Sequence, residues 1–174
     1  MIETARLRLR RPTEADIPGL VAALNEWSVA QWLARPPFPY TADDARAFLR
    51  WSEPAEGSAA PKAYVVADRI SDRLLGVASL EPQKGGAELG YWLAPAAQGR
   101  GYMREAVAAL LDEGAGRSSG ASVVHATTDP ENRRSQAILL GCGFRKVAEE
   151  ARERPTRRGG SVVFRFERDV RPVR

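Results

Sequence analysis

The stretch ELGYWLAPAAQGRGYMREAVAALL, residues 88–111, limits the fold of this chain more than any other part of the sequence. It begins as an alternating apolar run, which is typical of a half-buried strand. It ends with apolar residues at the spacing of one helix face: Met103, Val107, Leu110 and Leu111. Between the two lie Gly99 and Gly101, which can adopt positive φ and let a ligand approach the main chain. A helix beginning at Gly101 or Tyr102 would present free N–H groups and a positive dipole end, so the stretch predicts an anion-binding turn.

Two glycines alone leave a second interpretation open, a tight turn with no ligand. Arg100 and Arg104 favour a phosphate. The turn is not a dinucleotide fingerprint, because the third glycine of that motif would fall at Ala106. It is not a P-loop either, because no Lys followed by Ser or Thr comes after the last glycine.

The rest of the chain mixes strands and helices without a repeat. The pattern predicts a strand at 6–10, a helix within 12–27, and a second helix within 40–49 for which Thr41 and Asp44 are the start signal. It further predicts three consecutive strands within 63–94, the helix after Gly101, a strand at 121–128, a helix capped by Asn132, and two closing strands at 144–150 and 161–169. We therefore expect an α+β fold, with a single mixed, mostly antiparallel sheet flanked by helices, in one domain over residues 1–174.

Composition excludes several classes of function. No apolar run approaches the roughly 18 residues of a membrane helix, and no signal peptide follows Met1, so we expect a cytoplasmic protein with no membrane partner. One cysteine, Cys142, and one histidine, His125, argue against a disulfide and a metal site. The net charge of +4 is diffuse, so no nucleic-acid partner is expected. Cys142 is interpreted as a packing residue, and His125 as a hydrogen-bonded core residue rather than a base.

The motif ELGYWLAPAAQGRGYMREAV, together with DPENRRSQAILLGCGF and the opening ETARLRLRRPTEAD, is similar to the GNAT superfamily of N-acetyltransferases. The closest branch is that of the ribosomal-protein N-terminal (Rim-type) acetyltransferases. The resemblance implies the GNAT, or acyl-CoA N-acyltransferase, fold and direct transfer of an acetyl group from acetyl-CoA to a primary amine. Many relatives form dimers, so a homodimer is one option.

The resemblance also implies which residues bind the coenzyme. Main-chain amides of the turn would hold its pyrophosphate, and the preceding strand would bond the pantetheine arm at Trp92 and Leu93. Met103 departs from the family pattern, which has a small residue there. The expected coenzyme-binding residues are Trp92, Leu93, Gln98, Gly99, Arg100, Gly101, Tyr102, Met103, Arg104, Asn132 and Ser135.

The chemistry of transfer suggests two catalytic residues. Glu88 is the carboxylate best placed to take the proton of the attacking amine; the alternative is a solvated residue on the outer face of a strand. Relatives often protonate the leaving thiolate with a tyrosine, but Leu139 stands at that position. The resemblance leaves Ser135 as the proton donor or as a hydrogen-bond partner of the sulfur. Asn132 would contact the pantetheine arm, cap the helix, or do both.

The acceptor side is predicted in the segment EWSVAQWLARPPFPY, which in the family covers that side of the cleft. Its aromatic residues Trp27, Trp32, Phe38 and Tyr40 are expected to bind the acceptor; a small core under a loop is the alternative. The favoured acceptor is a protein or peptide α-amine, whose pKa of about 8 makes it easy to deprotonate. The other hypotheses are a small amine such as an antibiotic, polyamine or amino acid, which the basic composition disfavours when the amine is strongly cationic, and a non-catalytic acyl-CoA-binding module.

Overall fold

The computed structural model describes residues 1–54, 61–83, 85–112, 122–151 and 155–170. Its strands are β1 (Ile2–Glu3), β2 (Leu7–Arg10), β3 (Ala63–Asp68), β4 (Leu74–Gln83), β5 (Gly86–Leu93), β6 (Val123–Thr128), β7 (Arg145–Ala151) and β8 (Val162–Asp169). The helices are α1 (Ile17–Leu24), α2 (Trp27–Ala30), α3 (Ala42–Ser52), α4 (Tyr102–Leu110) and α5 (Arg133–Gly141), with 3-10 turns η1 (Glu14–Asp16) and η2 (Pro95–Ala97). The expected α+β architecture is confirmed.

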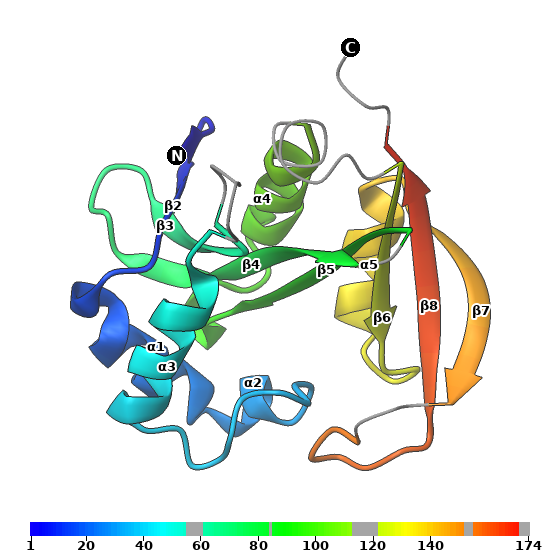
Figure 1. Cartoon of the computed structure of the whole chain (residues 1–174), viewed down its shortest axis with the longest axis horizontal. Coiled ribbons are helices and arrows are strands. Elements are labelled where there is room, and N and C mark those ends of the chain that lie inside the picture. The colour runs from blue at the N-terminus through cyan, green and yellow to red at the C-terminus, as the bar shows by residue number, and fades with distance from the viewer. Residues whose placement is uncertain (55–60, 84, 113–121, 152–154, 171–174) are drawn as a thin grey trace.

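All eight strands form one sheet in the order β1-β2-β3-β4-β5-β6-β8-β7 (Figure 1). Every neighbouring pair is antiparallel except β5 and β6. The three consecutive strands β3, β4 and β5 make the predicted meander. β1 was not predicted, because a strand of two residues has no periodicity to detect.

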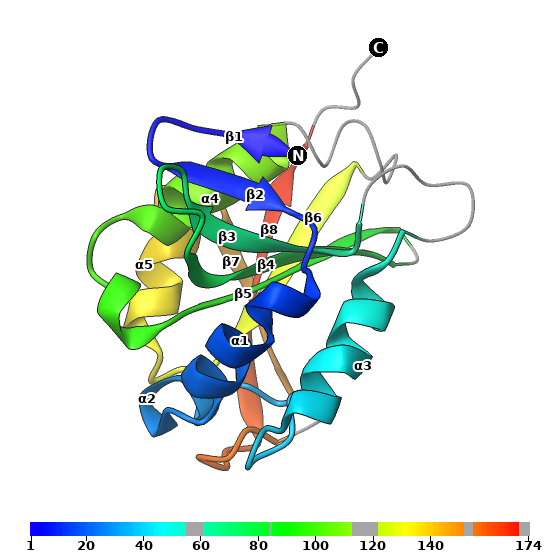
Figure 2. The ribbon, with the colours of Figure 1, turned by 90° about the vertical axis from the view of Figure 1, so that its left-hand side faces the viewer.

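Helices cover both faces of the sheet (Figure 2). On one face α4 and α5 pack against the sheet through a core that includes Leu7, Leu9, Met103, Val107, Leu110 and Leu139. On the other face α1 and α3 enclose a smaller core that includes Leu20, Leu24, Tyr40, Ala45 and Val77. Because successive side chains of a strand point to opposite faces, the sheet carries a core on each. We call the face of α4, on which the predicted anion-binding turn lies, the coenzyme-side face, and the second face carries the predicted acceptor segment.

The helix predicted through Trp27 is divided in the structure. α1 ends at Leu24, and the side chain of Asn25 accepts a hydrogen bond from Tyr40 N and donates one to Tyr40 O, both at 2.8 Å. This pairing with a residue far along the chain turns the backbone, so α2 begins as a separate short helix at Trp27. A tertiary contact has overridden a continuous helical pattern.

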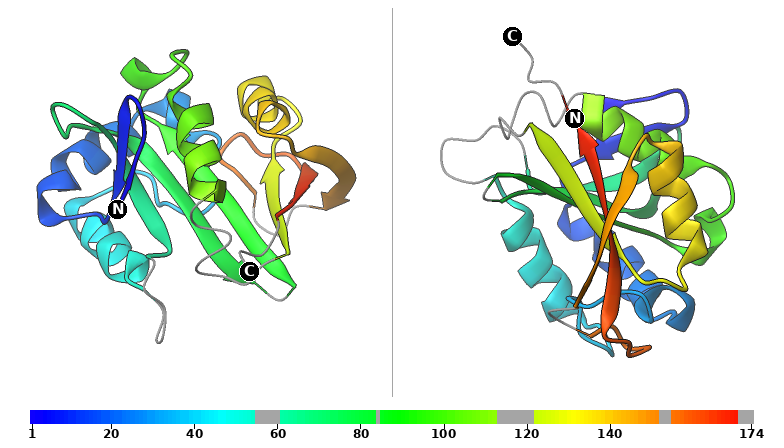
Figure 3. Two further views of the ribbon diagram at one scale, coloured as in Figure 1. Left: turned by 90° about the horizontal axis from the view of Figure 1, so that it is seen from above. Right: turned by 90° about the vertical axis from the view of Figure 1, so that its right-hand side faces the viewer.

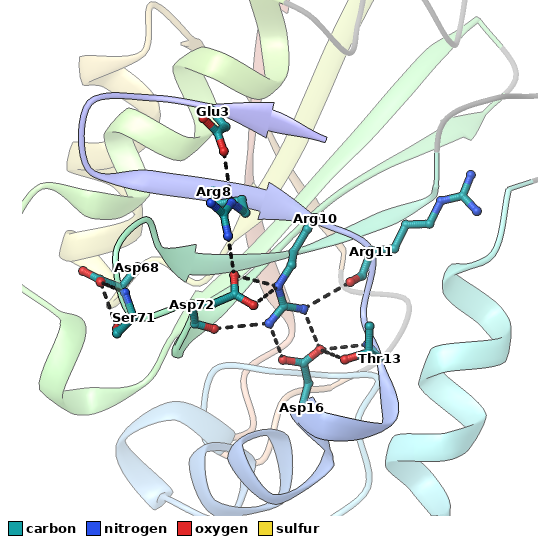
Figure 4. Close-up of polar contacts among 9 residues, drawn as sticks. All are labelled: Glu3, Arg8, Arg10, Arg11, Thr13, Asp16, Asp68, Ser71 and Asp72. Carbon is teal, nitrogen blue, oxygen red and sulfur yellow. Dashed lines mark hydrogen bonds and ion pairs between the residues drawn. The ribbon is translucent and has the colours of Figure 1, made fainter.

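A buried ion pair attaches the helical layer of the second face to the sheet (Figure 4). Both carboxylate oxygens of Asp16, in η1, accept 2.8 Å hydrogen bonds from Arg10 on β2. Thr13 adds two further bonds to Asp16, and Asp72 binds the opposite side of the Arg10 guanidinium. The pair fixes the start of α1 against β2.

The sheet opens between β5 and β6. Only two residue pairs, Ala87 with Val124 and Glu88 with His125, keep the parallel register. β5 then continues to Leu93 alongside β4, while β6 follows β8, and the two strands diverge (Figure 1). From Leu89 onward, the side of β5 that faces β6 has no strand partner among the residues that the structure describes.

Candidate active site

The predicted anion-binding turn lies between η2 and α4. Gly99 has φ +76° and Gly101 has φ +75°, a left-handed conformation that glycine adopts without strain. Within the described part of the chain, the main-chain amides from Gly99 to Arg104 donate no hydrogen bond. The first bond into α4 runs from Glu105 N to Gly101 O. A row of free amides at the positive end of a helix is suited to bind a diphosphate.

Of the side chains of the turn, those of Met103 and Arg104 pack against other parts of the protein, whereas that of Arg100 is exposed. Met103 is 2% exposed and belongs to the core, so its side chain points away from the free amides. Arg104 packs its guanidinium against α5, where a Cβ on Gly141 would lie only 3.2 Å from Arg104 Nε. Arg100 is exposed. Of the two arginines that favoured phosphate, only Arg100 is therefore placed beside the turn in this structure.

Arg6, which the sequence did not single out, braces the turn from the N-terminal hairpin. Its Nη1 donates to Arg100 O at 3.0 Å, and its guanidinium lies 4.8 Å from the centre of the Tyr102 ring. It also forms an ion pair with Glu105 at 2.7 Å, to which Thr4 adds a hydrogen bond. Burial opposes ionisation of Glu105, but the Thr4 and Arg6 bonds outweigh it and hold its pKa below the ordinary value.

The end of β5 is connected to α5 through Gln98. Gln98 Nε2 donates to Leu93 O at 3.0 Å, and Gln98 Oε1 accepts from Arg134 at 3.1 Å. Leu93 and Trp92 lie on the part of β5 beyond its pairing with β6. The main chain of this segment is thus placed beside the turn, as expected for binding a pantetheine arm, although Leu93 O already has a partner.

The first residues of α5 face β5 across the opening. Asn132 Oδ1 accepts from Ser135 N at 3.1 Å, so Asn132 is the helix cap that the sequence predicted. Ser135 Oγ lies 2.9 Å from the hydroxyl of Tyr91 on β5. Leu139 is fully buried in the core. Ser135 is therefore the residue of this helix with a hydroxyl at the opening, and Tyr91 is a neighbour that sequence reasoning missed.

Glu88 lies on the opposite face of β5, at the last residue paired with β6. Its Oε2 accepts from Gln83 at 2.7 Å and pairs with Arg35 at 3.1 Å. The same arginine also pairs with Glu81, the residue opposite Glu88 on β4. Within the described residues Glu88 Oε1 has no partner, so one oxygen of a 26% exposed carboxylate is free to accept a proton.

The acceptor face carries more carboxylates than the sequence suggested. His125 is opposite Glu88 in register, and Glu167 and Arg165 continue the same face on β8. His125 is half-buried, and burial and then Arg165 lower its pKa, although Glu88, Glu167 and Glu150 oppose them. A largely neutral imidazole beside Glu88 is a polar neighbour of the candidate base rather than part of the apolar core. No contiguous stretch of sequence contains this set, which explains why it was missed.

The four predicted acceptor aromatics lie in three different environments. Trp27 and Phe38 are about half-exposed and meet edge to face, with ring centres 5.9 Å apart. Tyr40 is buried in the second core, and burial, followed by the charge of Asp44, raises its pKa to about 12. Trp32 lies under the Arg158 guanidinium at 4.8 Å. Trp27 and Phe38 are accessible from solvent, so their predicted role in binding the acceptor stays a prediction, whereas Tyr40 fits the alternative of a small core under a loop.

Residues 155–161, in the connection between β7 and β8, contact this segment (Figure 3). Arg157 donates to Ala30 O at 3.1 Å, to Leu33 O at 2.9 Å and to Pro36 O, and its guanidinium lies 5.5 Å from the Phe38 ring. Arg158 binds Gln31 at 3.0 Å and also Glu131. We call residues 30–38 the acceptor wall. Its main chain is held by side chains from the far end of the sequence.

Two general expectations can be compared with the structure. Cys142 is buried, burial raises the pKa of its thiol, and its Sγ contacts Arg104 O at 3.7 Å, so the prediction of a packing role is confirmed. Among the described residues no group of His, Cys, Asp or Glu side chains could hold a metal ion. None of the helices in those residues has both the length and the apolar character needed to cross a membrane.

A mixed sheet that opens between two parallel strands, with free amides at the adjoining helix start, is the arrangement that the resemblance to acyl-CoA N-acyltransferases implied. Residues 6–145 match the acetyltransferase (GNAT) domain. The chain belongs to the GNAT family, whose members are acetyl-CoA-dependent N-acetyltransferases. The family and fold predictions are therefore confirmed.

Solved structures agree on the fold. A GNAT-family acetyltransferase from Bacillus anthracis is 20% identical with a TM-score of 0.80, and the match covers 97% of each chain. An acetyltransferase from Salmonella typhimurium that modifies the N-terminal serine of ribosomal protein L7/L12 is 21% identical, with 97% of each chain covered and a TM-score of 0.77. Spermidine N-acetyltransferase from Vibrio cholerae, with CoA and spermine, is 19% identical with a TM-score of 0.77, and the match covers 96% of this chain and 97% of that one. No curated protein matches the sequence.

Proposed function

We propose that this enzyme transfers the acetyl group of acetyl-CoA directly to the α-amine of a protein or peptide, without a covalent enzyme intermediate. The observation that carries the proposal is the position of Glu88. It is the last β5 residue paired with β6, so it stands where the opening for the pantetheine arm begins, and its side chain points to the face that carries the acceptor wall.

The proposed roles follow the order of the reaction. The free amides of the turn, from Gly99 to Met103, hold the pyrophosphate, while the Gln98 amide already donates to Pro95 O. Arg104 supports the turn by packing from α4 against α5, and the edge of β5 at Trp92 and Leu93 aligns the pantetheine arm. Glu88 Oε1 takes the proton of the attacking amine directly or through a water. A main-chain N–H near Leu93 faces the developing oxyanion. Ser135 stabilises the thiolate that leaves, and Asn132 fixes the start of α5 on which Ser135 stands.

A second acceptor class is favoured by one observation. Glu81, Glu88, Glu150 and Glu167 share the acceptor face with only Arg35 and Arg165 as paired cations among the described residues. This local charge is opposite in sign to the net charge of +4. A face rich in carboxylates suits a polycationic amine, which weakens the argument that overall charge makes against such an acceptor.

The test is release of CoA thiol from acetyl-CoA with three acceptors: a peptide with a free N-terminal serine or alanine, the same peptide with a blocked N-terminus and an internal lysine, and spermidine. The proposal expects turnover with the free N-terminus alone, confirmed by the mass of the acetylated peptide. Turnover restricted to spermidine would replace it with the second class. Tight CoA binding without turnover on any amine would indicate a non-catalytic module.

Glu88→Gln tests the base. The rate at neutral pH should fall about 100-fold and then rise with pH as the α-amine, with a pKa of about 8, deprotonates unaided. Glu149→Gln is the matched control, because Glu149 is also a carboxylate paired with a cation, Lys146, but lies on the edge strand β7. A pH–rate profile for Glu88→Gln that overlays the wild-type profile would remove Glu88 from the mechanism.

A further inference from the structure

The hydroxyl of Tyr91, on β5, contacts α5 beside the opening of the sheet. Tyr91 stands beyond the last residue of β5 that pairs with β6, and its ring packs against the coenzyme-side core. Its Oη lies 2.9 Å from Ser135 Oγ and 3.1 Å from Ser135 O. The contact therefore joins β5 to α5, the helix that follows β6, at the level where β5 and β6 are no longer paired.

Counting protons shows what this contact can do. Tyr91 and Ser135 each have one hydroxyl proton, and the Ser135 carbonyl can only accept. When Tyr91 donates to the carbonyl, the serine hydroxyl can donate to Tyr91 Oη and has no proton left for another group. When Tyr91 donates to Ser135 Oγ, the serine proton is free to point at a third atom. The second arrangement is the one in which Ser135 can serve an anion in the opening.

The surroundings of Tyr91 keep its proton in place. Burial raises the pKa of the phenol, and the bond with Ser135 only partly offsets that rise. Tyr91 therefore stays a neutral donor throughout the physiological pH range. The Ser135 carbonyl holds the phenol as the resting alternative, so the pair can change arrangement by rotation of two hydroxyl groups.

We infer that Tyr91 is a positioning residue, which directs the Ser135 hydroxyl toward the sulfur of the departing CoA. The inference rests on the proposed place of Ser135 beside the thioester. As the amine nitrogen bonds the carbonyl carbon, the carbon–sulfur bond breaks and its electron pair moves to sulfur. Ser135 then donates a hydrogen bond to the thiolate while Tyr91 donates to Ser135 Oγ. The amine loses one proton and the thiol finally gains one, so the two hydroxyl groups end the reaction unchanged.

The experiment measures the pKa of the CoA thiol bound to the enzyme, from the ultraviolet absorbance of the thiolate, and needs no acceptor. A donor aimed at sulfur stabilises the thiolate and lowers this pKa. We expect Tyr91→Phe and Ser135→Ala each to raise it by about one unit, since one hydrogen bond to a charged group contributes on that scale. The double variant should match Ser135→Ala, because Tyr91 acts only through the serine.

Ser52→Ala is the control for loss of a buried hydroxyl. Ser52 Oγ donates to Leu49 O at 2.7 Å at the end of α3, away from the opening, so the thiol pKa should not change. A wild-type thiol pKa in Tyr91→Phe, whether or not the variant melts earlier, would show that the contact is only a strut and would overturn the inference. Failure of the wild-type enzyme to bind CoA would reject the coenzyme turn and this inference together. Failure to acetylate any amine would reject the proposed function, yet the thiol pKa would still be measurable.

Discussion

The coenzyme turn is shaped mainly by residues close together in the sequence, whereas the acceptor wall is held by residues far apart in the sequence. The turn is part of one continuous stretch, β5 to α4, whose own glycines set its conformation and whose apolar residues fix it to the sheet. The acceptor wall contains only the last residue of the short helix α2, and its main-chain carbonyls are held by Arg157 from the connection between β7 and β8. The conformation of the turn is set mainly by its own stretch, with Arg6 and Arg134 adding contacts from elsewhere in the sequence, whereas the wall depends on Arg157 from a distant segment.

This difference suits the two ligands. Acetyl-CoA presents the same diphosphate to every member of the family, and we propose that free amides fixed by a strand–turn–helix unit are what binds it here. The acceptor differs among the structural neighbours, which include a ribosomal-protein enzyme and a spermidine enzyme. A wall assembled from distant segments can change its lining without disturbing the turn.

The largest expected effect is on the stability of the protein, and it tests whether the coenzyme turn depends on the helical layer that begins at α1. Asp16→Asn leaves the buried Arg10 with one of its two partners, and we expect the free energy of unfolding to fall by about 3 kcal/mol. Burial opposes ionisation of Asp16, but bonds from Arg10 and Thr13 hold its pKa below the ordinary value. The pair therefore stabilises the protein above the ordinary pKa of an aspartate, about 3.9, and this contribution is lost as pH falls through the folded pKa.

Urea unfolding of the wild type and Asp16→Asn between neutral and acid pH measures both statements. The difference between the two proteins should narrow as the pH falls below about 4. Asp43→Asn is the matched control: Asp43 forms an exposed ion pair with Arg46, and its loss should change stability by less than about 1 kcal/mol. CoA affinity of folded Asp16→Asn should stay near the wild-type value. A parallel loss of CoA affinity would mean that the turn also depends on the α1 layer.

The next effect concerns the turn alone. Gly99→Val should weaken CoA binding about 100-fold, because a β-branched side chain at positive φ is strained and its branches would occupy the space beside the free amides. Gly85→Val is a close match: Gly85 has φ +86°, and at both glycines an added Cβ would meet no atom within 4 Å, but Gly85 lies in the β4–β5 hairpin. Calorimetric titration with CoA compares the two. Equal losses in both variants would assign the effect to backbone strain rather than to the coenzyme site.

The same contrast explains which features the sequence predicted. The glycine turn, the Thr41 capping box of α3 and the Asn132 cap of α5 depend on residues within a few positions of one another, and all three are present. The meander followed from alternating strands separated by a short turn. These are signals that a local pattern can contain.

The features that the sequence did not predict all depend on partners far along the chain. The end of α1 at Leu24 requires Tyr40, and the brace behind the turn requires Arg6 to meet Glu105. The Arg35 bridge to Glu81 and Glu88 and the Tyr91 contact with Ser135 exist only once strands and loops are placed in register. The chemistry of transfer singled out Glu88, and the family resemblance singled out Ser135, but the sequence did not show what holds either side chain.

The smallest expected effect tests the long-range support of the acceptor wall. Arg157→Ala removes three bonds to main-chain carbonyls and the contact with Phe38, so residues 30–38 should open more often. We expect their amide hydrogens to exchange about tenfold faster, which corresponds to about 1.4 kcal/mol of lost local stability. The KM for an acceptor should rise by a similar factor, whereas exchange in the turn and the affinity for CoA should not change.

Arg158→Ala is the neighbouring control. Arg158 lies in the same connection, but it binds the side chains of Gln31 and Glu131 instead of the main chain of the wall. An exposed pair of this kind contributes roughly 0–1 kcal/mol, so exchange over residues 30–38 should change less than in Arg157→Ala. Equal acceleration in the two variants would show that the connection protects the wall as a whole, and that the bonds of Arg157 to the main chain have no special role. Acceleration that reaches the coenzyme turn would show that the two regions are coupled, and the ion pair between Arg35 of the wall and Glu88 of β5 is one route by which loosening could spread.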